Sequence, residues 1–258
     1  MIPYYADDLV TLYHGDCREV LPELTGVDLI FTSPPYNLGV TTGGGFGHWK
    51  DGQMHGGGGK WLAAKHDGDG MGYDRHGDAM PYQEYETWQR ECLSMMWGTL
   101  SDRGAIFYNH KPRVQAKSLW LPLALNPDLP VRQIIIWARS GGLNFAPTHY
   151  CPTHEWIIVF AKPGFRLSSR AASGVGDVWQ VHQQSNPDHP APFPVSLPAR
   201  AIETTAPRLV LDPFAGSGTT LRAAMDAGVK AIGIEISERY CELAVRRLGQ
   251  QVMVMPHG

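Results

Sequence analysis

Apolar residues fall into short continuous runs along the chain, and polar or glycine-rich turns separate the runs. Runs at 9–13 and 27–31 flank a segment at 17–24 that has helical spacing and follows a capping residue, Asp16. The run at 27–31, apolar except for Asp28 near its start, is typical of a strand that is buried on both faces of a parallel sheet. The pattern therefore predicts that the chain opens as strand, helix and strand.

The last fifty residues alternate most regularly. Strands are predicted at 208–212 and 229–235, and helices at 219–227 and 238–248. Strands that alternate with helices in this way form βαβ units, whose strands are parallel. The sequence thus predicts an α/β fold, with a mainly parallel sheet and helices on both faces.

The middle of the chain is less regular. An amphipathic helix is predicted at 82–100, a turn at 101–104 and a strand at 105–108. Two more apolar strands are predicted at 131–137 and 155–161. These elements supply one α/β core, so we expect a single domain over residues 1–258.

Two segments lack any hydrophobic period. Residues 38–79 are rich in glycine and histidine, and a structureless stretch of this length predicts a mobile surface loop with a function. Residues 164–188 are polar and irregular, with several basic side chains. Both segments are candidates for contacts outside the core.

Composition excludes several classes of protein. The net charge is −3, so a nucleic-acid partner would need a local basic face rather than overall charge. No apolar stretch is long enough for a membrane span, and the acidic N-terminal segment does not resemble a secretion signal. The four cysteines are far apart, and Cys151-x-x-His154 has no second ligand pair. We therefore expect a reduced, cytoplasmic protein without a metal site.

A glycine-rich turn links the predicted strand at 208–212 to the helix that follows, and it carries Asp212, Gly216 and Gly218. Glycines let the backbone approach a ligand closely, and a helix N-terminus offers free N–H groups. Glu235 ends the next strand, where an acidic side chain can accept both ribose hydroxyls. Because Asp212 would repel a pyrophosphate, the turn favours a cofactor with a cationic amine and a ribose, such as S-adenosylmethionine. An ordinary strand-to-helix turn is the alternative.

The segment Thr-Ser-Pro-Pro-Tyr at 32–36 follows a predicted buried strand, where ligands bind in open α/β sheets. Its two prolines remove two N–H donors and leave the Ser33 hydroxyl and the Pro34 carbonyl as rigid acceptors. Acceptors that bind both N–H groups of an aromatic amine favour pyramidalisation, which exposes the nitrogen lone pair to an electrophilic methyl group. The Tyr36 ring can stack on a base that has left its helix. A proline-rich turn with a structural tyrosine is the alternative.

Taken together, these motifs resemble those of the amino-methylating DNA methyltransferases. That family has a catalytic motif (Asn/Asp/Ser)-Pro-Pro-(Tyr/Phe) and a cofactor motif that varies on Asp-Pro-Phe-x-Gly-Ser-Gly-Thr-Thr. Here the catalytic motif comes first by some 180 residues, which is the circularly permuted order of the β-group. Segments 15–17, 137–164 and 189–200 also resemble family segments, and only 38–79 and roughly 164–188 fall outside the pattern.

The resemblance implies a circularly permuted, Rossmann-like class I methyltransferase fold, with a seven-stranded, mainly parallel sheet and an edge hairpin. It implies S-adenosylmethionine as cofactor, double-stranded DNA as substrate and 164–188 as an inserted target-recognition region. It leaves open a homodimer and a cognate restriction endonuclease, and it implies a bacterial or phage-infected cell as the setting. Carried over residue by residue, the catalytic positions are Ser33, Pro34, Pro35 and Tyr36, and the cofactor-binding positions are Asp16, Cys17, Phe193, Asp212, Phe214, Ala215, Gly216, Ser217, Gly218, Thr219 and Glu235.

The first residue of the catalytic motif bears on the target base. In the family, Ser-Pro-Pro-Tyr is commoner among cytosine-N4 enzymes and Asp-Pro-Pro-Tyr among adenine-N6 enzymes, so Ser33 favours site-specific methylation of cytosine N4 in DNA. The continuation Asn37-Leu38 also occurs in adenine enzymes. Adenine N6, an RNA base or a protein amide are alternative substrates, and a DNA-binding module without catalysis is a further alternative. A cytosine-C5 enzyme is not expected, because Cys151 precedes its proline instead of following one.

Overall fold

The computed structural model describes residues 1–37, 80–115, 118–139, 148–182 and 193–249, and the backbone of two short paired strands, β4 (His48–Lys50) and β5 (Gln53–His55). Most of the predicted loop at 38–79 and the end of the predicted recognition region at 164–188 lie outside these residues. The two ends of the loop are held together, because the Asn37 side chain pairs with the backbone N–H and carbonyl of Met80 at 2.7 and 2.9 Å.

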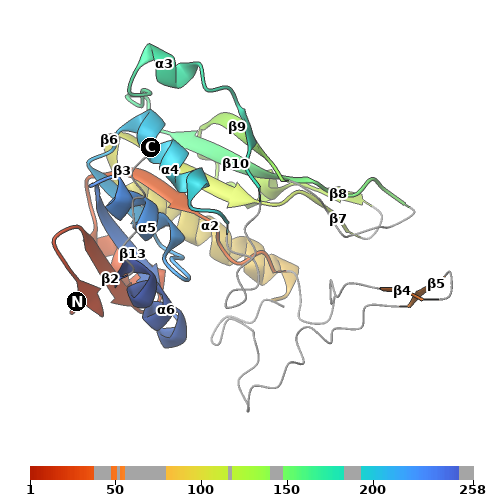
Figure 1. The fold of residues 1–258 in the computed structure, drawn as a ribbon, viewed down its shortest axis with the longest axis horizontal. Helices are drawn as coiled ribbons and strands as arrows, with labels where there is room; N and C mark the ends of the chain where they lie inside the picture. Colours follow the sequence, from red (N-terminus) through yellow and green to blue (C-terminus); the bar gives the residue numbers. More distant parts are fainter. Residues whose placement is uncertain are drawn as a thin grey trace, which may run out of the picture.

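Nine strands form one sheet, in the order β1-β2-β13-β12-β3-β6-β10-β9-β11 (Figure 1). The neighbours β2, β13, β12, β3 and β6 are parallel, whereas β10 is antiparallel to both β6 and β9. The strands are β1 (Tyr5–Ala6), β2 (Val10–His14), β3 (Val27–Thr32), β6 (Leu100–His110), β9 (Val131–Ala138), β10 (His154–Ala161), β11 (Val178–Gln180), β12 (Leu209–Asp212) and β13 (Lys230–Glu235).

This sheet confirms the predicted mainly parallel α/β fold and corrects the predicted strand number. Seven strands were expected, and the two additional ones, β1 and β11, are short strands at the two edges of the sheet. They have two and three residues, which is too short to leave a hydrophobic period in the sequence.

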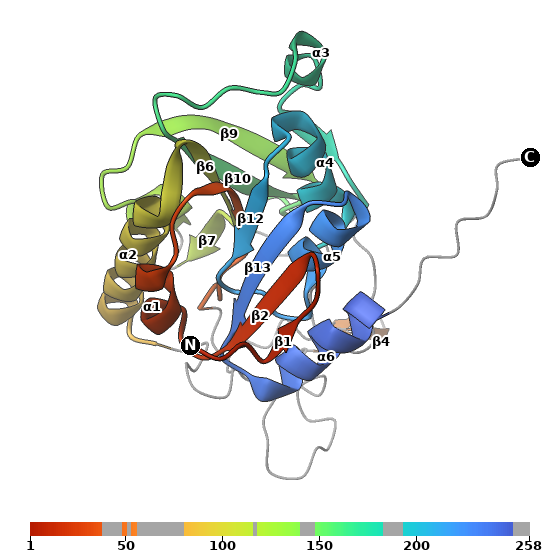
Figure 2. The ribbon, with the colours of Figure 1, turned by 90° about the vertical axis from the view of Figure 1, so that its left-hand side faces the viewer.

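Helices cover both faces of the sheet. Figure 2 shows α1 and α2 on one face, and α4, α5 and α6 on the other. The helices are α1 (Cys17–Val20), α2 (Tyr82–Thr99), α3 (Arg170–Ser173), α4 (Ser196–Thr205), α5 (Thr219–Asp226) and α6 (Glu238–Gly249), with 3₁₀ turns η1 (Leu21–Glu23) and η2 (Pro122–Leu125).

Alternate strand residues supply the two apolar layers. Ile30 and Ile106 belong to the cluster that contains Tyr85 of α2, whereas Leu29 belongs to the cluster that contains Leu221 of α5. Because successive strand side chains point to opposite faces, a continuous apolar strand is what a sheet covered on both faces requires. None of the helices in the described ranges is long and apolar enough to cross a bilayer.

The predicted turn at 101–104 is wrong, because β6 begins at Leu100 and runs through it. The polar side chains there are accommodated at the strand's exposed start, where Ser101 donates to Asp28 at 2.8 Å. Gly104 allows β6 to approach β3 closely: a Cβ at this position would lie 2.7 Å from the Val27 carbonyl oxygen.

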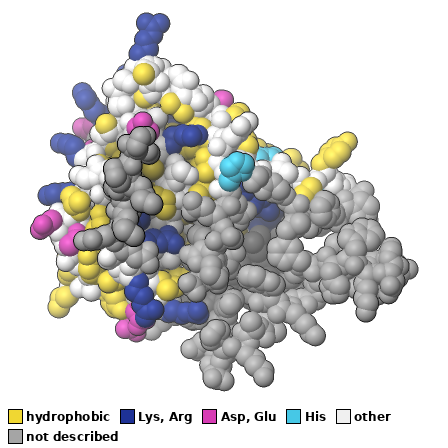
Figure 3. Space-filling model, viewed as in Figure 1, with side chains coloured by type: hydrophobic (Ala, Val, Ile, Leu, Met, Phe, Trp, Pro, Cys, Tyr) yellow, Lys and Arg dark blue, Asp and Glu magenta, His cyan; other side chains and the backbone are white. Residues whose placement is uncertain are grey.

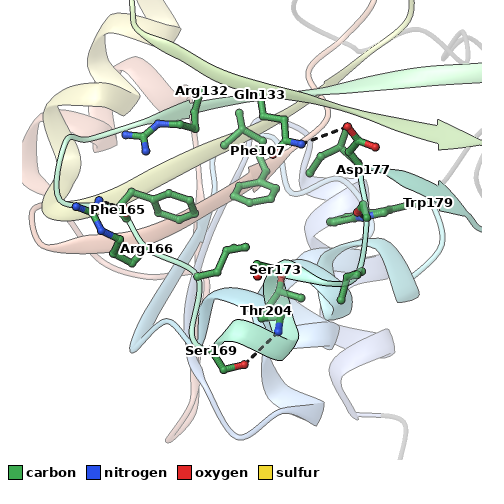
Figure 4. A pocket seen from close by; sticks show the side chains of 16 residues that line it. Phe107, Arg132, Gln133, Phe165, Arg166, Ser169, Ser173, Asp177, Trp179 and Thr204 are labelled. Atoms are coloured by element: carbon green, nitrogen blue, oxygen red, sulfur yellow. Dashed lines mark hydrogen bonds between the residues drawn. The ribbon is translucent and has the colours of Figure 1, made fainter.

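Two described segments stand apart from the layers. A short hairpin, β7 (Arg113–Gln115) and β8 (Ser118–Trp120), projects from the end of β6 as a separate two-stranded sheet (Figure 1). The segment 164–182 forms α3 and β11, and together with the sheet it lines an open, mainly apolar pocket of about 680 Å³ (Figure 4). Phe107, Phe165 and Trp179 line this pocket, and none of its lining residues belongs to the loops that follow the parallel strands.

Candidate active site

The predicted site residues gather at one edge of the sheet. Parallel strands place their carboxyl ends together, and Asp16, Ser33, Asp212 and Glu235 stand at or just after the ends of β2, β3, β12 and β13. The catalytic and cofactor motifs are in direct contact, because the Thr32 hydroxyl donates to Asp212 Oδ1 at 2.7 Å across 180 residues of chain.

Asp212 is completely buried, and only one of its two carboxylate oxygens accepts hydrogen bonds. Its Oδ1 accepts from the Thr32 hydroxyl and from the Phe214 N–H at 3.1 Å. Its Oδ2 is buried and accepts no hydrogen bond within the described part of the chain. Burial raises the pKa of Asp212 to about 6, although the hydrogen bond from Thr32 opposes that rise. A buried carboxylate oxygen without a donor fits a ligand that carries an ammonium group.

The glycines after Asp212 are required by backbone geometry. Gly216 and Gly218 have φ angles of 51° and 78°, in the left-handed region that favours glycine. A Cβ on Gly218 would also lie 3.0 Å from the Ala244 Cβ of α6. Between them the Ser217 hydroxyl is buried and has no partner among the described residues. The loop therefore brings backbone and one unpartnered hydroxyl to the start of α5, as a cofactor-binding turn requires.

Glu235 holds this loop against β13. One carboxylate oxygen accepts the Gly216 N–H at 2.8 Å, and the other accepts the Ser237 N–H at 2.9 Å. Burial, together with a smaller contribution from the nearby charge of Asp212, raises the pKa of Glu235 to about 7. Each carboxylate oxygen keeps a second acceptor position, so the predicted bonds to ribose hydroxyls are compatible with this geometry.

The pKa values of these two carboxyls predict how stability depends on pH. Both are raised in the folded protein, so the folded state binds its protons more tightly and gains stability below the unfolded values of 3.8 and 4.5. That stability is lost as the pH rises through about 6 and about 7, by on the order of 3 kcal/mol for each group. Denaturant unfolding near pH 4 and pH 8 measures the loss, which should be smaller in Asp212→Asn. The interpretation is refuted by equal losses in the variant and the wild type.

Asp16 and Cys17 lie beside Glu235, because the Gly15 N–H donates to the Glu235 carbonyl at 2.9 Å. Asp16 caps α1 by accepting the Arg18 N–H, and it also pairs with the Arg18 guanidinium at 2.7 Å. The Cys17 side chain is buried, and its Sγ lies 3.9 Å from the Sγ of Cys92 on α2. The Cys17 side chain therefore packs into the core beneath α2.

Of the remaining predicted cofactor positions, Phe214, Ala215 and Thr219 belong to the glycine loop and the start of α5, whereas Phe193 lies just before α4. Phe214 packs edge-on against Trp88 of α2, with ring centres 5.7 Å apart. Phe193 packs against Phe31 of β3 at 5.6 Å, on the other face of the sheet. The loop residues Ala215 and Thr219 are buried, and the Thr219 hydroxyl accepts from Arg247.

The catalytic motif is the centre of a polar network at the end of β3. The Tyr36 hydroxyl lies 2.9 Å from the Ser33 hydroxyl and donates to Glu155 Oε2 at 3.0 Å. The Asn109 amide donates to the Tyr36 hydroxyl at 2.7 Å and to Glu155 at 3.0 Å. Arg139 forms an ion pair with the other oxygen of Glu155 at 3.2 Å. The network orients both polar groups of the motif.

A second chain of hydrogen bonds fixes the proline turn. The Lys111 N–H donates to Nδ1 of His110, so the proton of this ring sits on Nε2 and is donated to the Tyr85 hydroxyl at 2.9 Å. Tyr85 in turn donates to the Pro35 carbonyl at 2.8 Å. Burial lowers the pKa of His110 to about 3, so the ring stays neutral. The His110 ring also stacks on Tyr36, with centres 4.4 Å apart.

The partners Asn109, His110 and Glu155 were not predicted from the sequence. Each is a polar residue beside an apolar run, 105–108 in β6 or 156–161 in β10, and all three are buried. A buried polar side chain requires a partner, so this position was a usable signal. No group of three or more His, Cys, Asp or Glu residues suited to a metal ion occurs in the described ranges.

Comparison with known proteins identifies the family of the chain. The sequence profile of the family N6_N4_Mtase, described as DNA methylase, matches residues 27–246. The type II methyltransferase M.ScaI of Streptomyces caespitosus is 31% identical over 276 residues, which cover 95% of this chain and 83% of that protein.

Two solved structures share the fold. The cytosine-N4-specific PvuII DNA methyltransferase has a TM-score of 0.70 at 17% identity, over 98% of this chain and 90% of that one. TTHA0409 from Thermus thermophilus, solved with S-adenosyl-L-methionine, has a TM-score of 0.61 at 22% identity, over 95% of each chain. The matches confirm the predicted family, the Rossmann-like fold and S-adenosylmethionine as cofactor. This chain belongs to the amino-methylating DNA methyltransferases.

Proposed function

We propose that the protein methylates the exocyclic N4 amine of cytosine within a specific sequence of double-stranded DNA. The contact between Thr32 and Asp212 carries the proposal, because it sets the Ser33 hydroxyl directly beside the cofactor loop. The bound cofactor supplies an electrophilic methyl group. Asp212 would hold its ammonium group, Glu235 its ribose and Phe214 its adenine side.

The residues of the catalytic motif would hold the target amine by its two N–H groups. The Pro34 carbonyl accepts no hydrogen bond from the described residues, so it is available to one N–H. The Ser33 oxygen would accept the other. Two acceptors placed in this way favour a pyramidal nitrogen, whose lone pair then projects out of the plane of the base.

The network behind Ser33 explains how a neutral hydroxyl can serve as this acceptor. Tyr36 donates its own proton to Glu155, so its oxygen can receive the Ser33 proton. The Ser33 oxygen also accepts from the Asn109 amide at 3.3 Å, so it keeps one lone pair for the substrate. The proton that leaves the amine can pass from Ser33 through the Tyr36 hydroxyl to the Glu155 carboxylate. The Tyr36 ring would stack on the base with the face opposite His110.

Ser33 is the observation that favours cytosine. In the family pattern a serine at this position goes with cytosine N4, and the PvuII enzyme, similar in fold, is cytosine-N4-specific by name. Residues 164–188 are proposed as the target-recognition region, supported by their position outside the family pattern. A homodimer, a cognate endonuclease and a cytoplasmic location stay predictions of the resemblance.

Methylation of plasmid DNA, followed by nucleoside mass spectrometry and modification-aware sequencing, tests the proposal. N4-methylcytosine in one sequence context is the expected product, and Asp212→Asn serves as the inactive control. N6-methyladenine would refute the choice of base but not the chemistry. Methylation of RNA or protein without methylation of DNA would overturn the DNA substrate.

A further inference from the structure

The β7–β8 hairpin carries two exposed apolar side chains next to the catalytic motif. Val114 and Leu119 are direct cross-strand partners, and 39% and 65% of their surfaces are exposed. The hairpin forms its own two-stranded sheet and projects beyond the body of the molecule (Figure 1). Figure 3 shows apolar side chains at this right-hand end of the described surface.

The base of the hairpin is fastened to the catalytic loop. Arg113 donates to the Tyr36 carbonyl at 2.6 Å, and its guanidinium lies 4.6 Å from the centre of the Trp120 ring. Trp120 donates to the Tyr82 hydroxyl at 3.0 Å and packs 5.3 Å from His110, which stacks on Tyr36. A two-stranded hairpin is marginally stable alone, so these contacts are what hold its apolar pair in a defined place beside Tyr36.

The substrate itself is the occupant that fits this position. DNA must approach the catalytic edge, and a base can reach Ser33 and Tyr36 only by leaving its stack. Its departure opens an apolar gap between the neighbouring base pairs. Proteins that distort DNA insert apolar side chains such as Phe, Leu, Ile or Met between base steps, because the side chain replaces part of the lost stacking.

We propose that Val114 and Leu119 form a wedge that enters the DNA duplex when the target base leaves it. The proposal rests on the proposed function, since it requires a base to be extruded from double-stranded DNA. Arg113 couples the wedge to the Tyr36 backbone, so entry of the hairpin and placement of the catalytic loop occur together. A second copy of this chain is the competing occupant of the same apolar pair.

The experiment compares two duplexes that share the sequence context methylated by the wild-type protein. In one the target base is paired, and in the other it lies opposite an abasic site, where extrusion costs less. We expect Val114→Ala/Leu119→Ala to lower kcat/KM by about tenfold on the paired duplex and by less than about twofold on the abasic duplex. Val131→Ala is the matched control, because Val131 is a valine of the same exposure, 40%, on the distant start of β9.

The outcomes separate the two proposals. Equal losses on both duplexes, or no loss on either, would overturn the wedge while the DNA methyltransferase activity stands. A sedimentation shift from dimer to monomer in the double variant would assign the pair to a subunit interface instead and would also overturn the wedge. Absence of methylation on either duplex by the wild-type protein would refute the proposed function itself.

Discussion

Asp212→Asn is expected to weaken S-adenosylmethionine binding by about 100-fold without unfolding the protein. The asparagine oxygen can still accept from Thr32 and Phe214, so the loop keeps both of its hydrogen bonds. Its amide nitrogen would then stand where Oδ2 stands, and it would turn two donor hydrogens toward the ammonium group. A charge-assisted pair is thereby replaced with an opposed pair of donors, which accounts for the size of the loss.

Calorimetric titration with S-adenosylmethionine measures the affinity, and denaturant unfolding near pH 8 measures stability. The free energy of unfolding should be unchanged or higher in the variant, because a buried carboxyl with a raised pKa is removed. Asp226→Asn is the control, since Asp226 makes an exposed ion pair with Arg222 at the end of α5. Unaltered affinity in Asp212→Asn would remove Asp212 from the cofactor site.

The parts of the fold that the sequence predicted are those in which local pattern and tertiary environment agree. The apolar run at 27–31 predicted β3, since a strand covered on both faces tolerates no polar side chain in its centre. The turn predicted at 101–104 failed because Ser101 and Asp102 look like turn residues locally, whereas the chain stays extended there as an irregularity of β6, which pairs with β3 at Leu100 and again from Ala105. Helix α4 was missed for a similar reason: Pro198 stands in its first turn, where proline is tolerated, so the segment reads as irregular.

In the candidate active site, too, the residues of local motifs were predicted and their distant partners were not. Ser33, Tyr36 and Asp212 were identified from short motifs, because the residues of each motif are adjacent in the sequence. The partners that complete the network are distant: Tyr36 and Glu155 are 119 residues apart. The order of the strands in the sheet decides which distant residues come into contact, and no single segment of the sequence encodes that order. The sequence could therefore identify the motifs but not the acceptors and donors behind them.

Tyr36→Phe and Tyr36→Ala are expected to separate the two roles of this side chain. Phenylalanine keeps the ring on His110 but removes the hydroxyl that joins Ser33 to Glu155. With saturating S-adenosylmethionine, kcat should fall by about 10- to 100-fold while KM for DNA changes by less than about twofold. Alanine also removes the stacking surface, so KM should rise by about tenfold or more and kcat should fall by about 1000-fold.

Glu155→Gln provides an independent test of the same network, because Glu155 accepts the Tyr36 proton and contacts no predicted substrate atom. It should lower kcat as Tyr36→Phe does, and the double variant should be no slower than either single variant, since both interrupt one path. Tyr4→Phe, at an exposed tyrosine near the N-terminus, controls for loss of a hydroxyl. Additive losses in the double variant would show that Glu155 acts on the site by another route. A Tyr36→Phe enzyme as slow as Tyr36→Ala would mean that the hydroxyl contributes all of the effect and that the ring does not stack on the base.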